Sequence, residues 1–322
     1  MSHFFSNYHP ANASLWQGRQ DHPGEERYFQ RVQCLSLLEH PLPMEKQTVF
    51  LGFASDAGII RNQGRPGAKY GPDQIRTQLA KLACQRYGTY LDIGNISCED
   101  DNLETAQEEL AKLISQCHQQ GHKTIVFGGG HEIAWPHFKG LSPYYPKMAI
   151  INFDAHFDLR PLVNGYQGTS GTPFTQIAQY CKEQQSSFAY CCLGIQPQGN
   201  THSLFEQAEQ LNVSYLTAEN INENSLAWQT AFLDNFMLNY DYIYLTICLD
   251  VFSECFAPGV SAPQALGISP WQAVPLLKYI VQTGKVVSVD IAELSPPLDP
   301  SGKTARLAAI LIAKLLEVNQ DF

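Results

Sequence analysis

The sequence predicts an α/β fold in which helices cover both faces of a mainly parallel sheet. Short apolar runs alternate with helical patterns from residue 48 to residue 318, as in chains built from β-α-β units. The 322 residues contain 44% hydrophobic and 16% charged side chains, a composition typical of a globular protein with a buried core. No linker rich in Pro, Gly or Ser divides the chain, so we expect one domain over residues 1–322.

The individual elements follow from apolar runs and from helix start and stop signals. Strands are expected at residues 48–53, 90–93, 124–127, 148–153, 188–193, 213–216, 242–249 and 285–291. Helices are expected at residues 71–85, 103–120, 174–183, 202–212, 225–238, 269–283 and 303–318. Residues 1–47 show no clear period, and we expect them to form an N-terminal extension packed on the domain.

Charge and cysteine content limit the classes of partner. A formal net charge of −10 argues against binding to nucleic acid or to an anionic membrane. The sequence shows no secretory signal pattern, and no apolar run reaches the roughly 18 residues that a membrane span needs. Nine cysteines without a C-x-x-C pair indicate free thiols in a reducing compartment. We therefore expect a cytoplasmic protein that acts on a small molecule.

Candidate metal ligands gather in the segment NFDAHFDLR at residues 152–160. Asp154, His156 and Asp158 alternate with apolar residues, so an extended backbone would point all three the same way. Carboxylates combined with an imidazole suit Mg, Mn, Fe or Zn better than a metal that prefers thiolates. The alternative is a polar loop in which an aspartate caps the next helix and the histidine is incidental.

Two other strand ends carry similar side chains. His131 follows the glycines at 128–130, and Cys248 and Asp250 alternate at the end of the 242–249 run. In an open α/β sheet, the carboxyl ends of the strands form the ligand-binding edge. Six potential ligands would converge there, enough for two metal ions that share carboxylates and activate a water molecule.

Arginines occur in loops at the same edge. The segment 55–76 is long and rich in glycine, and Arg61, Asn62 and Arg65 in it could bind an anionic group. Solvated arginines on a surface loop would explain the same pattern. Arg160 directly follows the ligand segment, and either anion binding or a structural ion pair could be its role.

The last strand adds two acidic candidates. Either Asp290 or Glu293 could contact a cationic group of a substrate, although a single acid often caps a helix instead. The chain contains no G-x-S-x-G motif, no Walker A loop and no G-x-G-x-x-G motif after a strand. Serine hydrolysis, nucleotide hydrolysis and dinucleotide redox chemistry therefore have no support.

These motifs resemble the ureohydrolase superfamily of arginase, agmatinase and formimidoylglutamase. The resemblance covers roughly residues 48–318 and rests on GGGHE at 128–132, NFDAHFDLR at 152–160 and DVFSECFAPG at 250–259. Within the superfamily, three loops look most like formimidoylglutamase: NQGRPGA at 62–68, SGTPF at 170–174 and APGVSAP at 257–263. The resemblance implies a three-layer α/β/α fold around a parallel sheet of about eight strands, and a site for two manganese ions. It also implies hydrolysis of N-formimidoyl-L-glutamate to L-glutamate and formamide, a step of histidine breakdown.

The resemblance also implies roles for individual residues. The metal-ligand positions are occupied by His131, Asp154, His156, Asp158, Cys248 and Asp250. Glu293 matches the acid that holds the amidine nitrogen, and Asp158 is the candidate for passing a proton to the leaving amine. The loop after the DAH motif lacks the histidine that arginases use as a proton shuttle, which argues against arginase. Because formimidoylglutamate carries two carboxylates, Arg160 with Arg61 or Arg65 could bind them.

Cys248 departs from the arginase pattern, in which an aspartate bridges both metals at this position. A thiolate is a soft ligand, whereas manganese prefers oxygen. Three outcomes are open: the thiolate bridges and favours iron or zinc, it stands aside and the second metal binds weakly, or the site has decayed.

Two further functions remain open beside the one that the resemblance implies. The chain could act on a guanidino acid, or it could be a metal-poor homologue without catalysis. It could also form a homo-oligomer, for which the sequence indicates no contact surface.

Overall fold

Eight parallel strands form the centre of the molecule in the computed structural model, which describes residues 6–20, 24–85 and 88–318. They are β3 (Thr48–Ala54), β4 (Tyr90–Ser97), β5 (Lys123–Phe127), β6 (Met148–Phe153), β7 (Tyr190–Ile195), β8 (Ser214–Thr217), β9 (Tyr242–Cys248) and β10 (Val286–Ala292). Across the sheet their order is β4-β3-β5-β10-β9-β6-β7-β8. The eight expected strands therefore all form, with boundaries that differ by a few residues.

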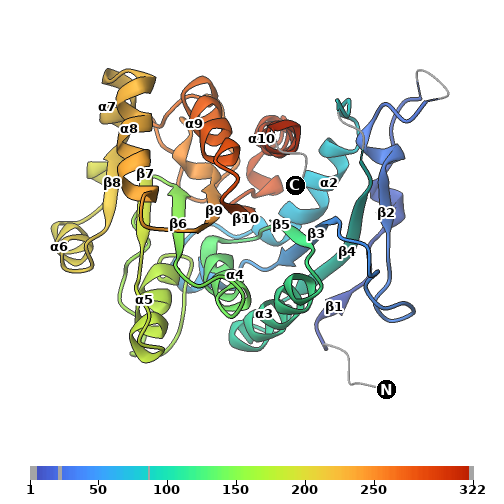
Figure 1. The fold of residues 1–322 in the computed structure, drawn as a ribbon, viewed down its shortest axis with the longest axis horizontal. Coiled ribbons are helices and arrows are strands. Elements are labelled where there is room, and N and C mark those ends of the chain that lie inside the picture. The colour runs from blue at the N-terminus through green and yellow to red at the C-terminus, as the bar shows by residue number, and fades with distance from the viewer. Residues whose placement is uncertain (1–5, 21–23, 86–87, 319–322) are drawn as a thin grey trace.

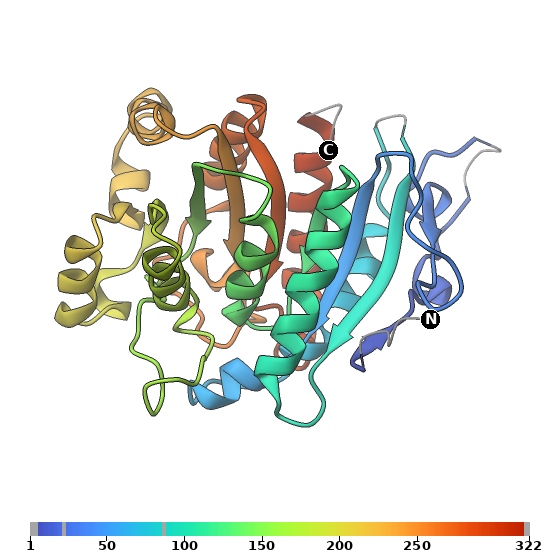
Figure 2. The same ribbon diagram turned by 60° about the horizontal axis from the view of Figure 1, so that its bottom comes forward.

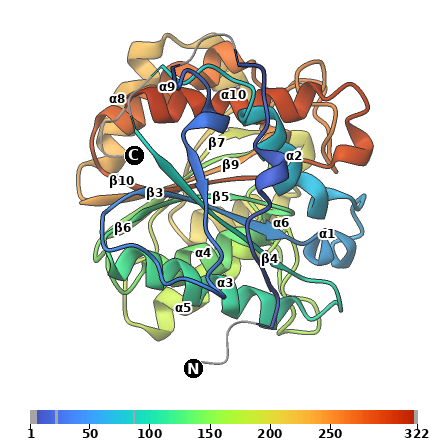
Figure 3. The same cartoon turned by 90° about the vertical axis from the view of Figure 1, so that its right-hand side faces the viewer.

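Helices lie on both faces of this sheet (Figures 1 and 3). On one face lie α3 (Leu103–Gln119), α4 (Ala134–Leu141) and α5 (Pro173–Glu183). On the other lie α2 (Gly71–Leu79), α8 (Leu226–Met237), α9 (Pro270–Gln282) and α10 (Lys303–Val318). This confirms the predicted three-layer α/β/α architecture.

Both faces of the strands are buried, which explains why the strands read as continuous apolar runs. In β5, Ile125 belongs to the core cluster on the α9 and α10 side, whereas Val126 belongs to the cluster on the α3 and α4 side. Neighbouring residues of a strand point to opposite faces, so each strand supplies side chains to two cores.

The N-terminal segment extends the sheet beyond β4. The short strands β1 (Tyr8–His9) and β2 (Val32–Cys34) both pair with β4, β1 in the antiparallel direction. Trp16 stacks on Phe50, and its indole nitrogen donates to Asp92 Oδ2 at 2.7 Å. Strands of two or three residues carry no periodic signal, so the sequence did not predict them. Residues 1–5 and 21–23 of the expected extension lie outside the described residues.

Several helices differ from the prediction. The sequence did not predict α1 (Ala57–Arg61), α4 or α7 (Ala218–Glu223), each of them short, while α6 (His202–Gln210) forms where expected. Helix α2 ends at Leu79 and not near residue 85, because the chain then pairs with the N-terminal segment: Cys84 N donates to Glu26 O at 2.7 Å. Within the described residues, no helix is both long and apolar enough to cross a membrane.

Candidate metal centre

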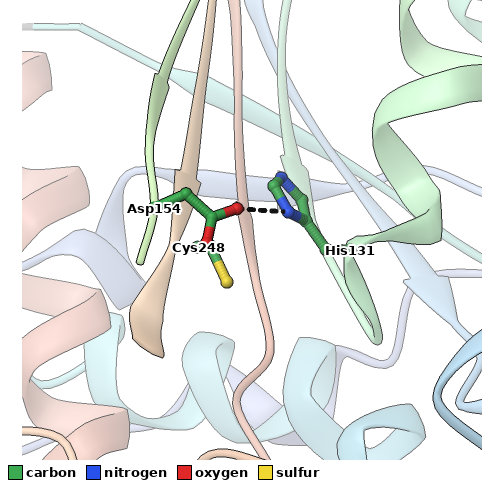
Figure 4. A group of neighbouring side chains, drawn as sticks. All are labelled: His131, Asp154 and Cys248. Carbon is green, nitrogen blue, oxygen red and sulfur yellow. Dashed lines mark ion pairs between the residues drawn. The ribbon is translucent and has the colours of Figure 1, made fainter. Parts of the chain in front are cut away.

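The candidate ligands follow the carboxyl ends of three of the four strands that lie side by side in the order β5-β10-β9-β6. His131 comes after β5, Asp154 comes directly after β6, and Cys248 is the last residue of β9. Figure 4 shows the Asp154 carboxylate facing the His131 ring, and the Cys248 thiol lies near both. The chain therefore brings together side chains that the sequence predicted to meet, of which His131 and Cys248 are more than 100 positions apart.

The turn after β5 requires glycine. A Cβ on Gly129 would lie 1.8 Å from Ser55 O, and the amide of Gly129 donates to Phe53 O at 2.8 Å. Only a residue without a side chain can approach the neighbouring backbone so closely. This turn leads directly into the short 3-10 helix that begins with His131.

Two groups of candidate ligands share Asp154. The ligand atoms of His131, Asp154 and Cys248 lie within 4.8 Å of one another, and so do those of Asp154, His156 and Asp250. His131 Nδ1 lies 3.0 Å from Asp154 Oδ2, and His156 Nδ1 lies 3.1 Å from Asp250 Oδ2. A carboxylate common to both groups is the arrangement that two neighbouring cations need.

Asp158, from the same loop as Asp154, lies beside the first group. Its Oδ2 lies 2.9 Å from His131 Nδ1. Its backbone φ is 49°, in the left-handed region that non-glycine residues seldom adopt. Such strain is retained where the surrounding structure holds it, and it is frequent at functional sites.

Burial and close charges shift the pKa values in this centre. Burial, followed by repulsion from Asp154, raises the pKa of Asp158 to about 6. For Asp154, burial acts in the opposite direction, but hydrogen bonds from His131 and His156 prevail and lower its pKa. Burial also opposes the charged forms of His131 and His156, yet the neighbouring carboxylates raise the pKa of both. The histidines therefore act as the counter-charges of the carboxylates.

The thiol of Cys248 is buried beside this group. Burial, followed by repulsion from Asp154, Asp250 and Glu293, raises the pKa of Cys248 well above its ordinary value. A cation would have to displace the thiol proton before the sulfur could serve as a ligand.

Two observations test whether the residues present suit a cation. Asp250 Oδ1 is buried and makes no hydrogen bond among the described residues, so it is available as a ligand atom. On the other side, Thr246 Oγ1 donates to Asp290 Oδ1 at 2.5 Å and lies 3.0 Å from His131 Nε2. Because the single hydroxyl proton of Thr246 goes to Asp290, His131 Nε2 must carry a proton, and Nδ1 is the nitrogen that would give up its proton to a cation. Both observations fit a divalent cation with oxygen and imidazole ligands.

A cavity of about 340 Å³ opens above the candidate ligands. Asn62, Arg65, Arg160 and Glu293 line it. The guanidinium of Arg160 makes no hydrogen bond or ion pair among the described residues, whereas that of Arg65 donates to the backbone oxygens of Val260 and Ser261.

Arg61 lies elsewhere. Its guanidinium pairs with Glu104 at 2.6 Å and donates to Asp101 O at 2.8 Å, and it does not line the cavity. Arg61, which the sequence predicted as a candidate for anion binding, is thus held by an acidic partner on α3. Figure 2 shows α1, which ends at Arg61, next to the loop after β6, and Ser170 N of that loop donates to Gly58 O.

The two acids of β10 have different environments. Asp290 lies within the strand and is fully buried, where it accepts hydrogen bonds from Tyr244 and Thr246 and pairs with His137 at 2.6 Å. Glu293 lines the cavity, and its Oε1 accepts from His131 N at 2.9 Å. Of the two alternatives, only Glu293 is placed to meet a ligand.

Sequence reasoning missed two residues that support the centre. Thr246 precedes Cys248 by two positions on the same strand, so strand alternation alone would have placed it beside the ligands. Asn200 contacts the backbone of the ligand loop through its side chain, and no local pattern in the sequence signals such a contact.

Comparison with known proteins identifies the family. The family model described as Arginase family matches residues 46–317. The chain belongs to the arginase family. The predicted resemblance to this group of enzymes is thereby confirmed.

Relatives of this arginase-family chain include proteins named formimidoylglutamase. The one from Legionella pneumophila (strain Lens) is 62% identical over 314 residues, which cover 98% of each chain. The one from Clostridium tetani (strain Massachusetts / E88) is 41% identical over 97% of this chain and 96% of its own length.

A solved structure of formimidoylglutamase from Bacillus subtilis has the same fold, with a TM-score of 0.81 at 22% identity over 93% of this chain and 95% of its own. The Trypanosoma cruzi formiminoglutamase, solved with Mn²⁺, has a TM-score of 0.76 at 24% identity over 87% of this chain and 95% of its own.

Proposed function

We propose that this chain hydrolyses N-formimidoyl-L-glutamate to L-glutamate and formamide in the cytoplasm, as a step of histidine breakdown, with two manganese ions at the candidate metal centre. The relatives named formimidoylglutamase support this substrate. The observation that carries the proposal is the cavity itself. Carboxylate and imidazole groups of the candidate ligands line it, and so does Arg160, whose guanidinium is free.

The six candidate ligands keep the roles proposed from the sequence. They are His131, Asp154, His156, Asp158, Cys248 and Asp250, and all but Asp154 line the cavity. Bound manganese would supply a nucleophile from water at neutral pH and polarise the formimidoyl group.

Glu293 would hold the cationic nitrogen of the substrate. Burial, followed by repulsion from Asp250 and Glu132, raises the pKa of its carboxyl well above the ordinary value. A cationic amidine would favour the charged carboxylate. One carboxyl oxygen accepts from His131 N, and the other would accept from the amidine.

Asp158 would give a proton to the amine that leaves when the bond between the formimidoyl carbon and the glutamate nitrogen breaks. In the centre without a cation, burial and repulsion from Asp154 raise the pKa of this carboxyl to about 6, and a group that transfers protons works best when its pKa lies near the working pH. The lone guanidinium of Arg160 and the anchored guanidinium of Arg65 would bind the two carboxylates of the substrate.

The first test compares two arginines. Replacing Arg160 with Gln removes the free cation at the cavity, and we expect kcat/KM for N-formimidoyl-L-glutamate to fall about 10- to 100-fold, mainly through KM, because a hydrogen bond to a charged group contributes roughly 1.5–3 kcal/mol. Arg61→Gln is the matched control, since Arg61 pairs with Glu104 outside the cavity, and its KM should stay near that of the wild type. An unchanged KM in Arg160→Gln would remove this residue from substrate binding.

The second test follows the products and the metal. Protein freed of metal and reloaded with manganese should release formamide and glutamate in equal amounts. Release of urea from a guanidino acid would point to the other substrate class, and less than about one metal per chain would point to a homologue without catalysis. Activity with iron or zinc alone would show that Cys248 sets the choice of metal.

A further inference from the structure

The side-chain amide of Asn200 brackets the candidate ligand His156. Asn200 Oδ1 accepts from the amide of Phe157 at 3.0 Å, and Nδ2 donates to the carbonyl of Ala155 at 2.9 Å. These are the peptide groups directly before and after His156. The amide therefore holds the backbone of one ligand residue from both sides.

A third contact ties this amide to its own segment. Nδ2 also donates to Gln196 O at 2.8 Å, and Gln196 N donates to Ala155 O at 2.9 Å. The side chain of Asn200 is almost fully buried, with 6% of the residue exposed. Buried amides must be hydrogen-bonded, so the loss of these partners would leave backbone groups of the ligand loop unsatisfied.

The orientation of the His156 ring depends on its backbone more than that of the His131 ring does. The side chain of His156 is 21% exposed, and its Nε2 makes no hydrogen bond among the residues that the structure describes. His131 is buried, and Thr246 holds its Nε2. Among the described residues, no hydrogen bond to the His156 ring corresponds to the one between Thr246 and His131 Nε2.

Gly199 adds an independent observation beside this ring. A Cβ at position 199 would lie 3.3 Å from both Cδ2 and Nε2 of His156. The absence of a side chain there leaves room for the imidazole in its present orientation. The pair Gly199-Asn200 thus contacts both the ring and the backbone of the same ligand.

We propose that Asn200 is a positioning residue for His156, and that Gly199 provides the space for its ring, so that the group Asp154, His156 and Asp250 can bind its metal ion. This rests on the proposed function, because it assumes that His156 is a ligand. Asn200 acts through the backbone and not on the substrate.

The test is a manganese titration of metal-free protein, in which free Mn²⁺ is followed by electron paramagnetic resonance and both dissociation constants are fitted. Asn200→Ala should weaken one of the two sites about 10- to 100-fold and leave the other near its wild-type affinity. Asn200→Asp keeps the acceptor for Phe157 N but places a carboxylate oxygen against the carbonyl of Ala155, and it should weaken the same site at least as much. Gly199→Ala removes no hydrogen bond, and it should weaken that site to a smaller degree.

Gln229→Ala is the matched control. Gln229 of α8 is a buried amide with 5% of the residue exposed, and its Nε2 donates to the backbone oxygens of Ile221 in α7 and Asn224 just after α7, both at 2.8 Å and outside the site. The melting temperature of Gln229→Ala should fall by about as much as that of Asn200→Ala. Both manganese affinities of Gln229→Ala should stay at the wild-type values. Equal weakening in Gln229→Ala would overturn the proposal, because general destabilisation would then explain the effect.

His156→Ala distinguishes a failure of the proposed metal centre from a failure of the proposed positioning role. If it leaves both manganese affinities unchanged, His156 is not a ligand and the proposed metal centre fails. If it weakens one site while Asn200→Ala and Gly199→Ala bind as the wild type does, only the positioning role is overturned. Should Asn200→Ala not fold, Gly199→Ala decides the outcome alone.

Discussion

Thr246 decides which nitrogen of His131 faces the carboxylates. It sits between a buried carboxylate, Asp290, and the imidazole, at 2.5 Å and 3.0 Å respectively. A threonine hydroxyl has one proton but can accept as well, so donation to Asp290 fixes acceptance from His131. Support of this kind orients a metal-binding histidine and keeps it in one tautomer.

We predict that Thr246→Val weakens manganese binding about 10- to 100-fold, because the nearly isosteric side chain cannot accept the proton of His131 Nε2. Thr246→Ser keeps the hydroxyl and should restore most of the affinity. The measurement is the same manganese titration.

Thr124→Val is the control for this prediction. Thr124 is an equally buried threonine on β5, with hydrogen bonds to His118 and Ser288 and none to a candidate ligand. Weaker metal binding in Thr124→Val, by as much as in Thr246→Val, would refute a specific role for Thr246.

At the scale of elements, buried polar contacts join α3 to the sheet. His118 of α3 lies 2.9 Å from Thr124 Oγ1 of β5, which lies 2.6 Å from Ser288 Oγ of β10. The other ring nitrogen of His118, Nδ1, lies 2.7 Å from the Tyr145 hydroxyl. Burial, aided by the nearby charges of His137, His122 and Lys123, lowers the pKa of His118 to about 3.

This shift predicts how stability depends on pH. The native state keeps His118 neutral down to about pH 3, whereas the unfolded chain binds a proton at this residue below its ordinary pKa of 6.5. Stability from this site is therefore complete above pH 6.5 and is lost as the pH falls toward 3. Between pH 6.5 and 4.5, the free energy of unfolding of metal-free wild type should fall about 2–3 kcal/mol more than that of His118→Gln, measured by urea denaturation.

His40→Gln is the control for this slope, because His40 is exposed in the native state. Its stability should fall with pH in parallel with the wild type. If the free energy of unfolding of His118→Gln falls with pH in parallel with that of the wild type, His118 binds its proton equally in the native and the unfolded state, and the prediction is refuted.

At the scale of the whole molecule, the centre depends on four strands meeting at one edge of the sheet. The candidate ligands follow β5, β6 and β9; β5 and β6 are consecutive in the sequence, but β10 and β9 lie between them in the sheet. Asp154, Asp158 and Asp250 lie close together, with His131 and His156 as their counter-charges. A divalent cation would relieve this repulsion, and so metal binding should contribute to the stability of the fold.

We predict that manganese raises the melting temperature of the chelator-treated protein by about 5 °C when it is present at roughly 100 times its dissociation constant, since such binding adds about 2.7 kcal/mol. Asp154→Asn should lose most of this increase, because Asp154 belongs to both ligand groups. Differential scanning calorimetry with and without manganese measures both. An equal increase in Asp154→Asn would show that the metal binds elsewhere.

Much of this fold could be predicted because both sides of each inner strand are buried. A run such as residues 148–153 is apolar except for Asn152 and is followed directly by Asp154, so its position and its polar edge are visible in the chain. Elements that depend on contacts between distant segments were missed. Helix α4 is short and contains Pro136, and β1 has two residues that become a strand only by pairing with β4.

The candidate site divides in the same way. The sequence by itself determined which side chains would gather, because strand alternation and glycine turns place His131, Asp154 and Cys248 at carboxyl ends of strands. Only the tertiary structure decided that Arg61 is bound by Glu104, that Arg160 is left free, and that Asn200 holds the loop of His156. The physical reason is that a hydrogen bond between remote segments depends on distance and direction, which the order of residues along a chain does not contain.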